Sequence, residues 1–154
     1  MEPFGATIFC DDIRDELHGK TSLIGVYGTE LVSYDEFPLS LPKMGFYITV
    51  CFPVGGPLIS DVKLHVYLPQ DKKGQPSYSS SLGWQTTAED SSLPDPKVFP
   101  DPLGVIQFTT YVLLGPINIQ KSGFFRVRLT HQDQEIKIGA LEAVYREQNK
   151  KQQT

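Results

Sequence analysis

Acidic side chains are the first candidates for chemistry in this sequence, because carboxylates bind metal ions and transfer protons. Four of them are close together, at Asp11, Asp12, Asp15 and Glu16. Carboxylates at a strand end can bind a hard cation such as calcium, which takes about six to eight oxygen ligands. The Asp-x-Asp-x-Asp-Gly spacing of an EF-hand loop is absent. Basic residues lie in the same segment, so a solvated turn with weak local ion pairs is the competing interpretation.

A second acidic set lies in a proline-rich stretch further along the chain. Its members are Glu89, Asp90, Asp95 and Asp101. In a β-sandwich the two acidic sets could meet at one end and hold a cation between loops, although no Asp-x-Asp pair occurs in either. A cation-binding sandwich that uses Asp11, Asp12 and this stretch is therefore one candidate, with the metal left open.

Nucleophilic residues give no pattern of a known active site. His18, His65 and His131 are not spaced with one another or with a cysteine as zinc ligands are. Cys10 and Cys51 lie in apolar runs, where a low thiolate pKa is hard to arrange, and we interpret them as small buried hydrophobic residues. No Gly-x-Ser-x-Gly, P-loop or dinucleotide-binding pattern is present. The sequence therefore predicts no catalytic residue, no cofactor and no enzymatic activity.

Two aromatic residues are candidates for contact with a partner. Trp84 and Phe99 flank or lie within the proline-rich stretch. A large aromatic group there needs either a pocket or a partner, and tryptophan is enriched among the residues that dominate binding energy. Contact with a protein partner is therefore one prediction for these two residues, and burial in the core of the domain is the alternative.

The elements that must position these residues are short strands. Period-two alternation and brief apolar runs between turn signals dominate the chain. Residues 11–20 are expected to form a hairpin connection or one helical turn. The prolines of 85–104 predict a long irregular loop. The expected strands cover residues 6–10, 21–27 with 30–32 as an extension, 46–52, 61–68, 79–86, 105–114, 117–119, 124–130 and 135–145.

This pattern predicts an all-β fold. About seven to nine strands without a strong amphipathic helix favour an antiparallel β-sandwich, C2-like or immunoglobulin-like in architecture, with a closed barrel as the alternative. Residues 1–146 are predicted to form one domain. Residues 147–154 have no apolar side chain and are predicted to be a polar, disordered tail.

Composition and charge exclude several classes of protein. The 154 residues are 40% hydrophobic and 21% charged, which excludes general disorder and a fibrous protein. The net charge of −4 argues against binding nucleic acid through bulk phosphate attraction. Neither a secretory signal nor an apolar run of about 18–20 residues is present. We therefore expect a soluble protein in a reducing cytoplasm, with free thiols and no membrane contact.

The first strands resemble a known family. Residues 6–27 contain an apolar strand that leads into Cys10-Asp11-Asp12, then Glu-x-x-Gly-Lys at 16–20, and an apolar run that ends in Gly-Val-Tyr at 25–27. This segment, IFCDDIR-E--GK-SLIGVY, is similar to the opening of a family of small bacterial and bacteriophage proteins of unassigned function. The resemblance implies a prokaryotic or phage origin and a single β domain, and it brings no catalytic residues.

These observations predict a non-enzymatic, cytoplasmic binding or interaction module, with the phage-related origin that the resemblance implies. We expect it to recognise a host protein or to assemble with itself, for which an exposed edge strand offers sheet extension. The alternative is a sandwich that binds a small ligand or a divalent cation through its acidic loops. An enzyme of unrecognised type is a third possibility.

Overall fold

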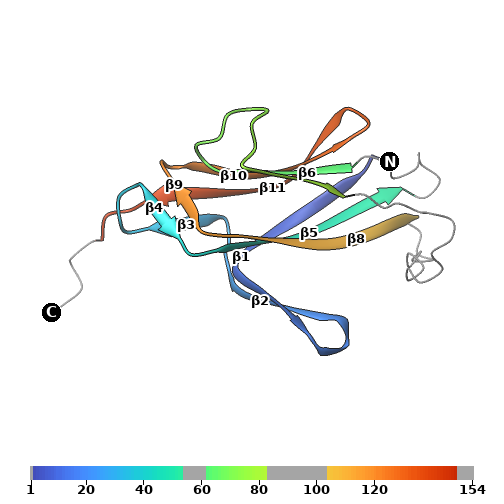
Figure 1. The fold of residues 1–154 in the computed structure, drawn as a ribbon, viewed down its shortest axis with the longest axis horizontal. Coiled ribbons are helices and arrows are strands. Elements are labelled where there is room, and N and C mark those ends of the chain that lie inside the picture. The colour runs from blue at the N-terminus through green and yellow to red at the C-terminus, as the bar shows by residue number, and fades with distance from the viewer. Residues whose placement is uncertain (1, 54–61, 83–103, 149–154) are drawn as a thin grey trace.

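A computed structural model describes residues 2–53, 62–82 and 104–148. Two main sheets pack face to face as the two layers of a sandwich (Figure 1). Sheet A has the order β2 (Lys20–Val26), β1 (Phe4–Glu16), β5 (Met44–Pro53), β8 (Val105–Leu114). Sheet B has the order β3 (Glu30–Ser33), β11 (Gln134–Tyr145), β10 (Gly123–His131), β6 (Val62–Tyr67), β7 (Tyr78–Leu82). A small third sheet pairs β4 (Leu39–Leu41) with β9 (Ile117–Ile119).

The all-β sandwich predicted from the sequence is confirmed, with differences in detail. The described residues hold eleven strands rather than seven to nine. They form separate sheets, so the closed barrel is wrong. Residues 30–33 do not extend the second strand. They form β3, which runs parallel to β11 at the edge of sheet B, so this sheet is not purely antiparallel. Leu31 is buried in the core there.

The core lies between the two sheets and is built on alternate residues of facing strands. Phe46 is fully buried, with its ring centroid 5.6 Å from that of Phe9 and 6.4 Å from that of Phe125. Burial of such aromatic side chains dominates the packing energy of a small domain. The inward residues of the two central strands are Phe46, Ile48, Val50 and Phe52 on β5, and Phe125, Val127 and Leu129 on β10.

Strand β1 belongs to two pairings in turn. Residues 4–10 pair with β5, and residues 10–16 pair with β2. The expectation of a connection over 11–20 is therefore wrong for 11–16, which are strand, and holds only for the 3-10 turn η1 (Leu17–Gly19). A two-stranded ribbon does not bury one whole face, so its polar sequence gives no alternation to read. We call residues 11–26 the arm; it projects from the sheet A side, away from sheet B (Figure 1).

Other expectations fall partly or wholly outside the described residues. Most of the proline-rich stretch 85–104 does so, and so does the tail 147–154 apart from Glu147 and Gln148. Both cysteines are buried free thiols, as predicted. Within the ranges given above, the structure has no helix that is long and apolar enough to cross a membrane.

Candidate functional site

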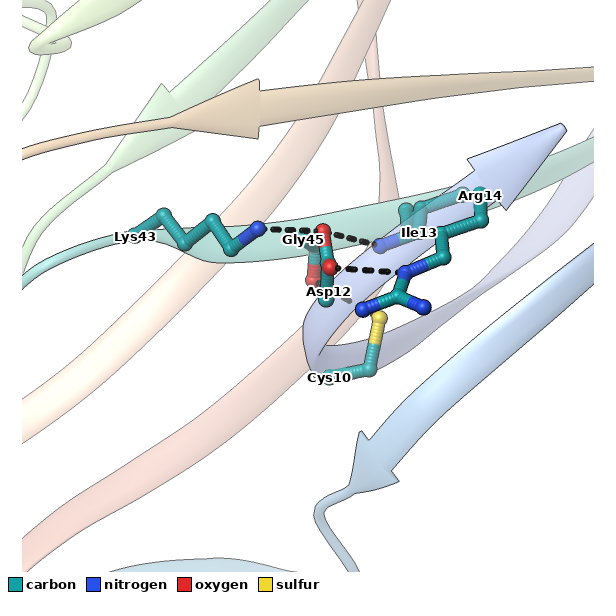
Figure 2. A network of polar contacts seen from close by, with 6 residues as sticks. All are labelled: Cys10, Asp12, Ile13, Arg14, Lys43 and Gly45. Atoms are coloured by element: carbon teal, nitrogen blue, oxygen red, sulfur yellow. Dashed lines mark hydrogen bonds and ion pairs between the residues drawn. The ribbon is translucent and has the colours of Figure 1, made fainter.

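The base of the arm is anchored by Asp12. Its carboxylate accepts hydrogen bonds from the Ile13 amide at 3.0 Å and Arg14 Nε at 3.3 Å, and pairs with Lys43 Nζ at 2.7 Å (Figure 2). The hydrogen bond from Lys43, with that from Arg14, holds the pKa of this carboxyl below its ordinary value. Since Lys43 directly precedes β5, this network joins the arm to the centre of sheet A.

A close contact beneath Asp12 completes the anchor. The Cys10 thiol donates to the Gly45 carbonyl at 3.8 Å, and burial raises the pKa of that thiol (Figure 2). A Cβ on Gly45 would lie 2.8 Å from Ile13 Cγ1 and 2.9 Å from Cys10 Sγ, so only glycine lets the arm approach β5 here. Burial also raises the pKa of the Cys51 thiol. Both thiols are therefore held protonated, which does not suit a nucleophile.

The remaining acidic residues of the arm point to separate partners. Asp11 accepts a hydrogen bond from the Tyr27 hydroxyl, and Asp15 accepts one from Tyr111 Oη at 2.8 Å. The hydrogen bond to Asp15 raises the pKa of Tyr111. Glu16 is exposed at the end of β1, and its side chain has no hydrogen bond or ion pair within the described part of the chain. Asp12 and Asp15 thus fix the arm to sheet A, and the four carboxylates have separate surroundings instead of sharing one centre.

The other predicted site residues cannot be placed beside this anchor. Trp84, Asp95, Phe99 and Asp101 lie outside the described residues. Among residues 2–53, 62–82 and 104–148, no group of three or more histidine, cysteine, aspartate or glutamate side chains could hold a metal ion. The partner contact through Trp84 and Phe99 stays a prediction, as does a cation site that involves the 89–101 acidic set.

The outer face of sheet A is the feature that sequence reasoning missed. Register aligns Ile8, Tyr47 and Tyr111 in one row across β1, β5 and β8, and Cys10, Gly45 and Leu113 in the next. None of the twelve outward positions is charged where residues 4–10 of β1 pair with β5 and β5 pairs with β8. We call these positions the uncharged face; they are Phe4, Ala6, Ile8, Cys10, Gly45, Tyr47, Thr49, Cys51, Gln107, Thr109, Tyr111 and Leu113. Cys10, Gly45 and Cys51 among them are buried within the chain itself.

Large side chains are exposed on the uncharged face. Phe4 is 47% exposed, Ile8 41%, Leu113 41% and Tyr111 36%. Neither strand β5 nor strand β8 contains a charged residue. The lack of charge in these two strands is visible in the sequence. Because polar residues interrupt both apolar runs, the sequence alone excludes a membrane span there and indicates no other role.

The outer face of sheet B has the opposite character. Its outward positions carry Lys63 and His65 on β6, Arg126 and Arg128 on β10, and Glu142 on β11. Antiparallel sheets with one side in water normally alternate apolar inward and polar outward residues. Sheet B follows this rule and sheet A does not, so the two outer surfaces cannot have the same role.

One histidine on sheet B has the neighbours of a catalytic pair without its third member. His65 Nδ1 lies 2.7 Å from Ser79 Oγ, and Nε2 lies 3.2 Å from Thr130 Oγ1. A serine nucleophile needs a base whose other nitrogen is oriented by a carboxylate or similar group, whereas here it meets a hydroxyl. Burial, with Lys63 nearby, lowers the pKa of His65. The arrangement is suited to linking β7, β6 and β10 through a neutral imidazole.

Two open hollows lie near the end of sheet B at β3. One, of about 610 Å³, contains the carboxylates of Glu36 and Glu142 with the rings of Phe37 and Tyr145. The other, of about 510 Å³, lies against Tyr27 and Leu31. Both volumes fall in the range of small-molecule sites, about 300–1,000 Å³, but both hollows are open, whereas such sites usually enclose most of the ligand.

Comparison with known proteins adds no assignment. No family model, curated protein sequence or solved structure matches this chain. The resemblance of residues 6–27 to a bacterial and bacteriophage family therefore stays a prediction.

Proposed function

We propose that this protein is a non-enzymatic binding module that docks onto another protein surface through the uncharged face of sheet A. The observation that carries this proposal is the absence of charge from all twelve outward positions, four of which expose large apolar or aromatic side chains. Contiguous apolar surface on a domain in water is typical of an interaction site.

The edge of the same sheet supports this proposal. Strand β8 is ten residues long, has neither charge nor proline, and pairs with β5 without a register shift. Among the described strands, β8 pairs only with β5, so its other edge is unpaired there. Proteins normally protect such an edge with lysine, proline or a bulge, because it offers backbone groups to a further strand. A partner on the uncharged face could therefore also extend the sheet.

The uncharged face is also rigid enough to bind without rearrangement. Its central strand, β5, is hydrogen-bonded on both sides, and the inward residues of that strand are fully or nearly fully buried. A preformed surface loses little conformational entropy on association. The buried free thiols Cys10 and Cys51 suit a reducing compartment, so we propose that binding takes place in the cytoplasm.

Native mass spectrometry of the protein as purified from its source cells tests this function. We expect the wild-type chain to carry a further polypeptide, either another copy or a different protein. Leu113→Lys should be free of it, because a lysine on the uncharged face would be buried without a partner. Phe124→Lys is the matched control, since Phe124 is 50% exposed but lies on the outer face of sheet B.

Two results would contradict the proposal. One is a wild-type chain that carries no polypeptide. The other is equal loss of the polypeptide from both lysine variants. A small-molecule or metal adduct instead of a polypeptide would favour the ligand-binding alternative.

A further inference from the structure

We infer that the occupant of the uncharged face is a second copy of this chain, packed so that two A sheets form the middle of a four-layer dimer. This inference rests on the proposed function and goes further by naming the partner. In such a dimer each sheet B, with its charged surface, stays in water.

Charge is the first reason to favour an identical copy. A two-fold axis lying between two stacked A sheets places each uncharged face against its own duplicate. Any charged side chain on the face would then be buried near its own kind or left without a partner, at a high free-energy cost. The three strands contribute no charged side chain to the face. The arm brings Asp15 to it, but this carboxylate already accepts a hydrogen bond from Tyr111 of the same chain, so the face is compatible with its own duplicate. A surface shaped for a different protein usually carries charges that steer and select that protein.

The size of the uncharged face shows that the arm must take part in the dimer interface. Three strands about 4.8 Å apart, each seven residues long at about 3.3 Å per residue, present about 330 Å². A stable complex usually buries about 800 Å² on each partner. The uncharged face alone falls short of this area, and the surface next to it has to supply the remainder.

The arm is the surface next to it. Val26 pairs with Cys10 and so continues the row formed by Cys10, Gly45 and Leu113. Val26 is 57% exposed, Ile24 40% and the tip residue Leu17 81%. The arm projects on the sheet A side of the sandwich, where a second copy would sit (Figure 1).

The arm also gains from being covered. A two-stranded hairpin is marginally stable in water without further packing. The contacts of the arm with its own sheet are made by Asp12, Ile13 and Asp15. Each arm clasping the other copy would bury the apolar residues that these contacts leave exposed.

Sedimentation velocity over a dilution series tests this inference. We expect the purified wild-type chain to be a dimer that dissociates on dilution between about 100 and about 1 µM. Leu113→Lys and Ile8→Lys, from two different strands of the uncharged face, should each weaken the dimer at least about tenfold. Phe124→Lys should leave the dissociation constant unchanged. Leu17→Ser should weaken the dimer if the arm clasps the partner, and circular dichroism should show that every variant is folded.

The outcomes separate this inference from the proposed function. A wild-type chain that stays monomeric at about 100 µM overturns the inference. If a different co-purifying protein is then lost from Leu113→Lys and retained by Phe124→Lys, the proposed function stands. If Leu113→Lys and Ile8→Lys both keep the dissociation constant of the wild-type dimer, the dimer is joined through another surface, which overturns the inference. If neither the wild-type chain nor any variant associates with a polypeptide, the proposed function and this inference both fail.

Discussion

His65 illustrates how one side chain can hold neighbouring strands together. It bridges Ser79 and Thr130 through its two ring nitrogens. Burial and Lys63 lower its pKa, and Glu135 opposes them more weakly. The folded protein therefore favours the neutral imidazole more than the unfolded chain does. The stability that this preference gives is present above the unfolded pKa of 6.5, and is lost as the pH falls from there through the lower folded pKa.

The prediction concerns the pH dependence of unfolding. Between about pH 7.5 and about pH 5, the wild-type free energy of unfolding should fall more than that of His65→Gln, which cannot titrate there. Urea titrations at both pH values measure the difference. His18→Gln, in the exposed turn of the arm, should behave as the wild type does. Equal losses in the wild type and His65→Gln would show that His65 is not the group responsible.

The acidic residues of the arm lead to a prediction about divalent cations. Asp12 is occupied by Lys43 and Arg14, Asp11 by Tyr27, and Asp15 by Tyr111. A cation would have to displace these partners and gather carboxylates that point apart. We therefore expect the melting temperature to be the same in about 5 mM calcium or magnesium as in EDTA. Only a ligand that binds the folded state more tightly than the unfolded state raises the melting temperature.

A thermal melt with and without each metal checks this expectation. The informative variant is Asp12→Asn, and the matched control is Glu16→Gln. A rise in melting temperature that Asp12→Asn abolishes and Glu16→Gln keeps would restore the cation-binding alternative.

Among the structural elements, the arm depends on one glycine. Gly45 lets Ile13 and Cys10 lie against β5, where a Cβ would come within 3 Å of both. We expect Gly45→Ala to lower the free energy of unfolding by about 1–3 kcal/mol, the usual cost of overpacking. In the Gly45→Ala/Ile13→Ala double variant the two costs should not add, because removing Ile13 makes room for the new methyl group.

Urea unfolding of the single and double variants measures this coupling. Gly28→Ala is a suitable control, since a Cβ there meets no atom within 4 Å. If Gly45→Ala were as stable as Gly28→Ala, the close approach of the arm would not matter to the fold.

Sequence patterns predicted the strands that bury one face and failed where this condition is absent. Strands β6 and β10 alternate strictly because each packs against the core on one side only. Residues 11–16 belong to a ribbon without such a face, so their strand was missed. Strand β3 was assigned to the wrong neighbour, because a four-residue edge strand does not reveal which sheet will accept it.

The candidate site was harder to predict than the strands. Each of Ile8, Tyr47 and Tyr111 is unremarkable in its own segment. They become one surface only through the pairing of β1 and β8 with β5, and no short-range pattern encodes that pairing. Local sequence thus reveals the lack of charge, while the register of distant strands turns it into a face.

The molecule as a whole has two unlike sides. Sheet B carries lysine, arginine and glutamate outward, whereas the outward positions of β5, β8 and residues 4–10 of β1 carry no charge. The net charge of −4 gives two copies a weak mutual repulsion, which salt screens. Any association through the uncharged face should therefore be driven by burial of apolar surface, and the only electrostatic force against it should be this weak repulsion.

This asymmetry makes the salt dependence of self-association diagnostic. Between about 50 and about 500 mM NaCl, we expect the dissociation constant of the dimer to change by less than about threefold, with any change towards tighter binding. Isothermal dilution calorimetry at several temperatures should give a negative heat-capacity change on association, which marks burial of apolar surface. Phe124→Lys should give the same two results, because its added charge lies on the solvated sheet B. A dimer that weakens tenfold in salt would instead be held by opposite charges, and the charged surface of sheet B would then be the interface.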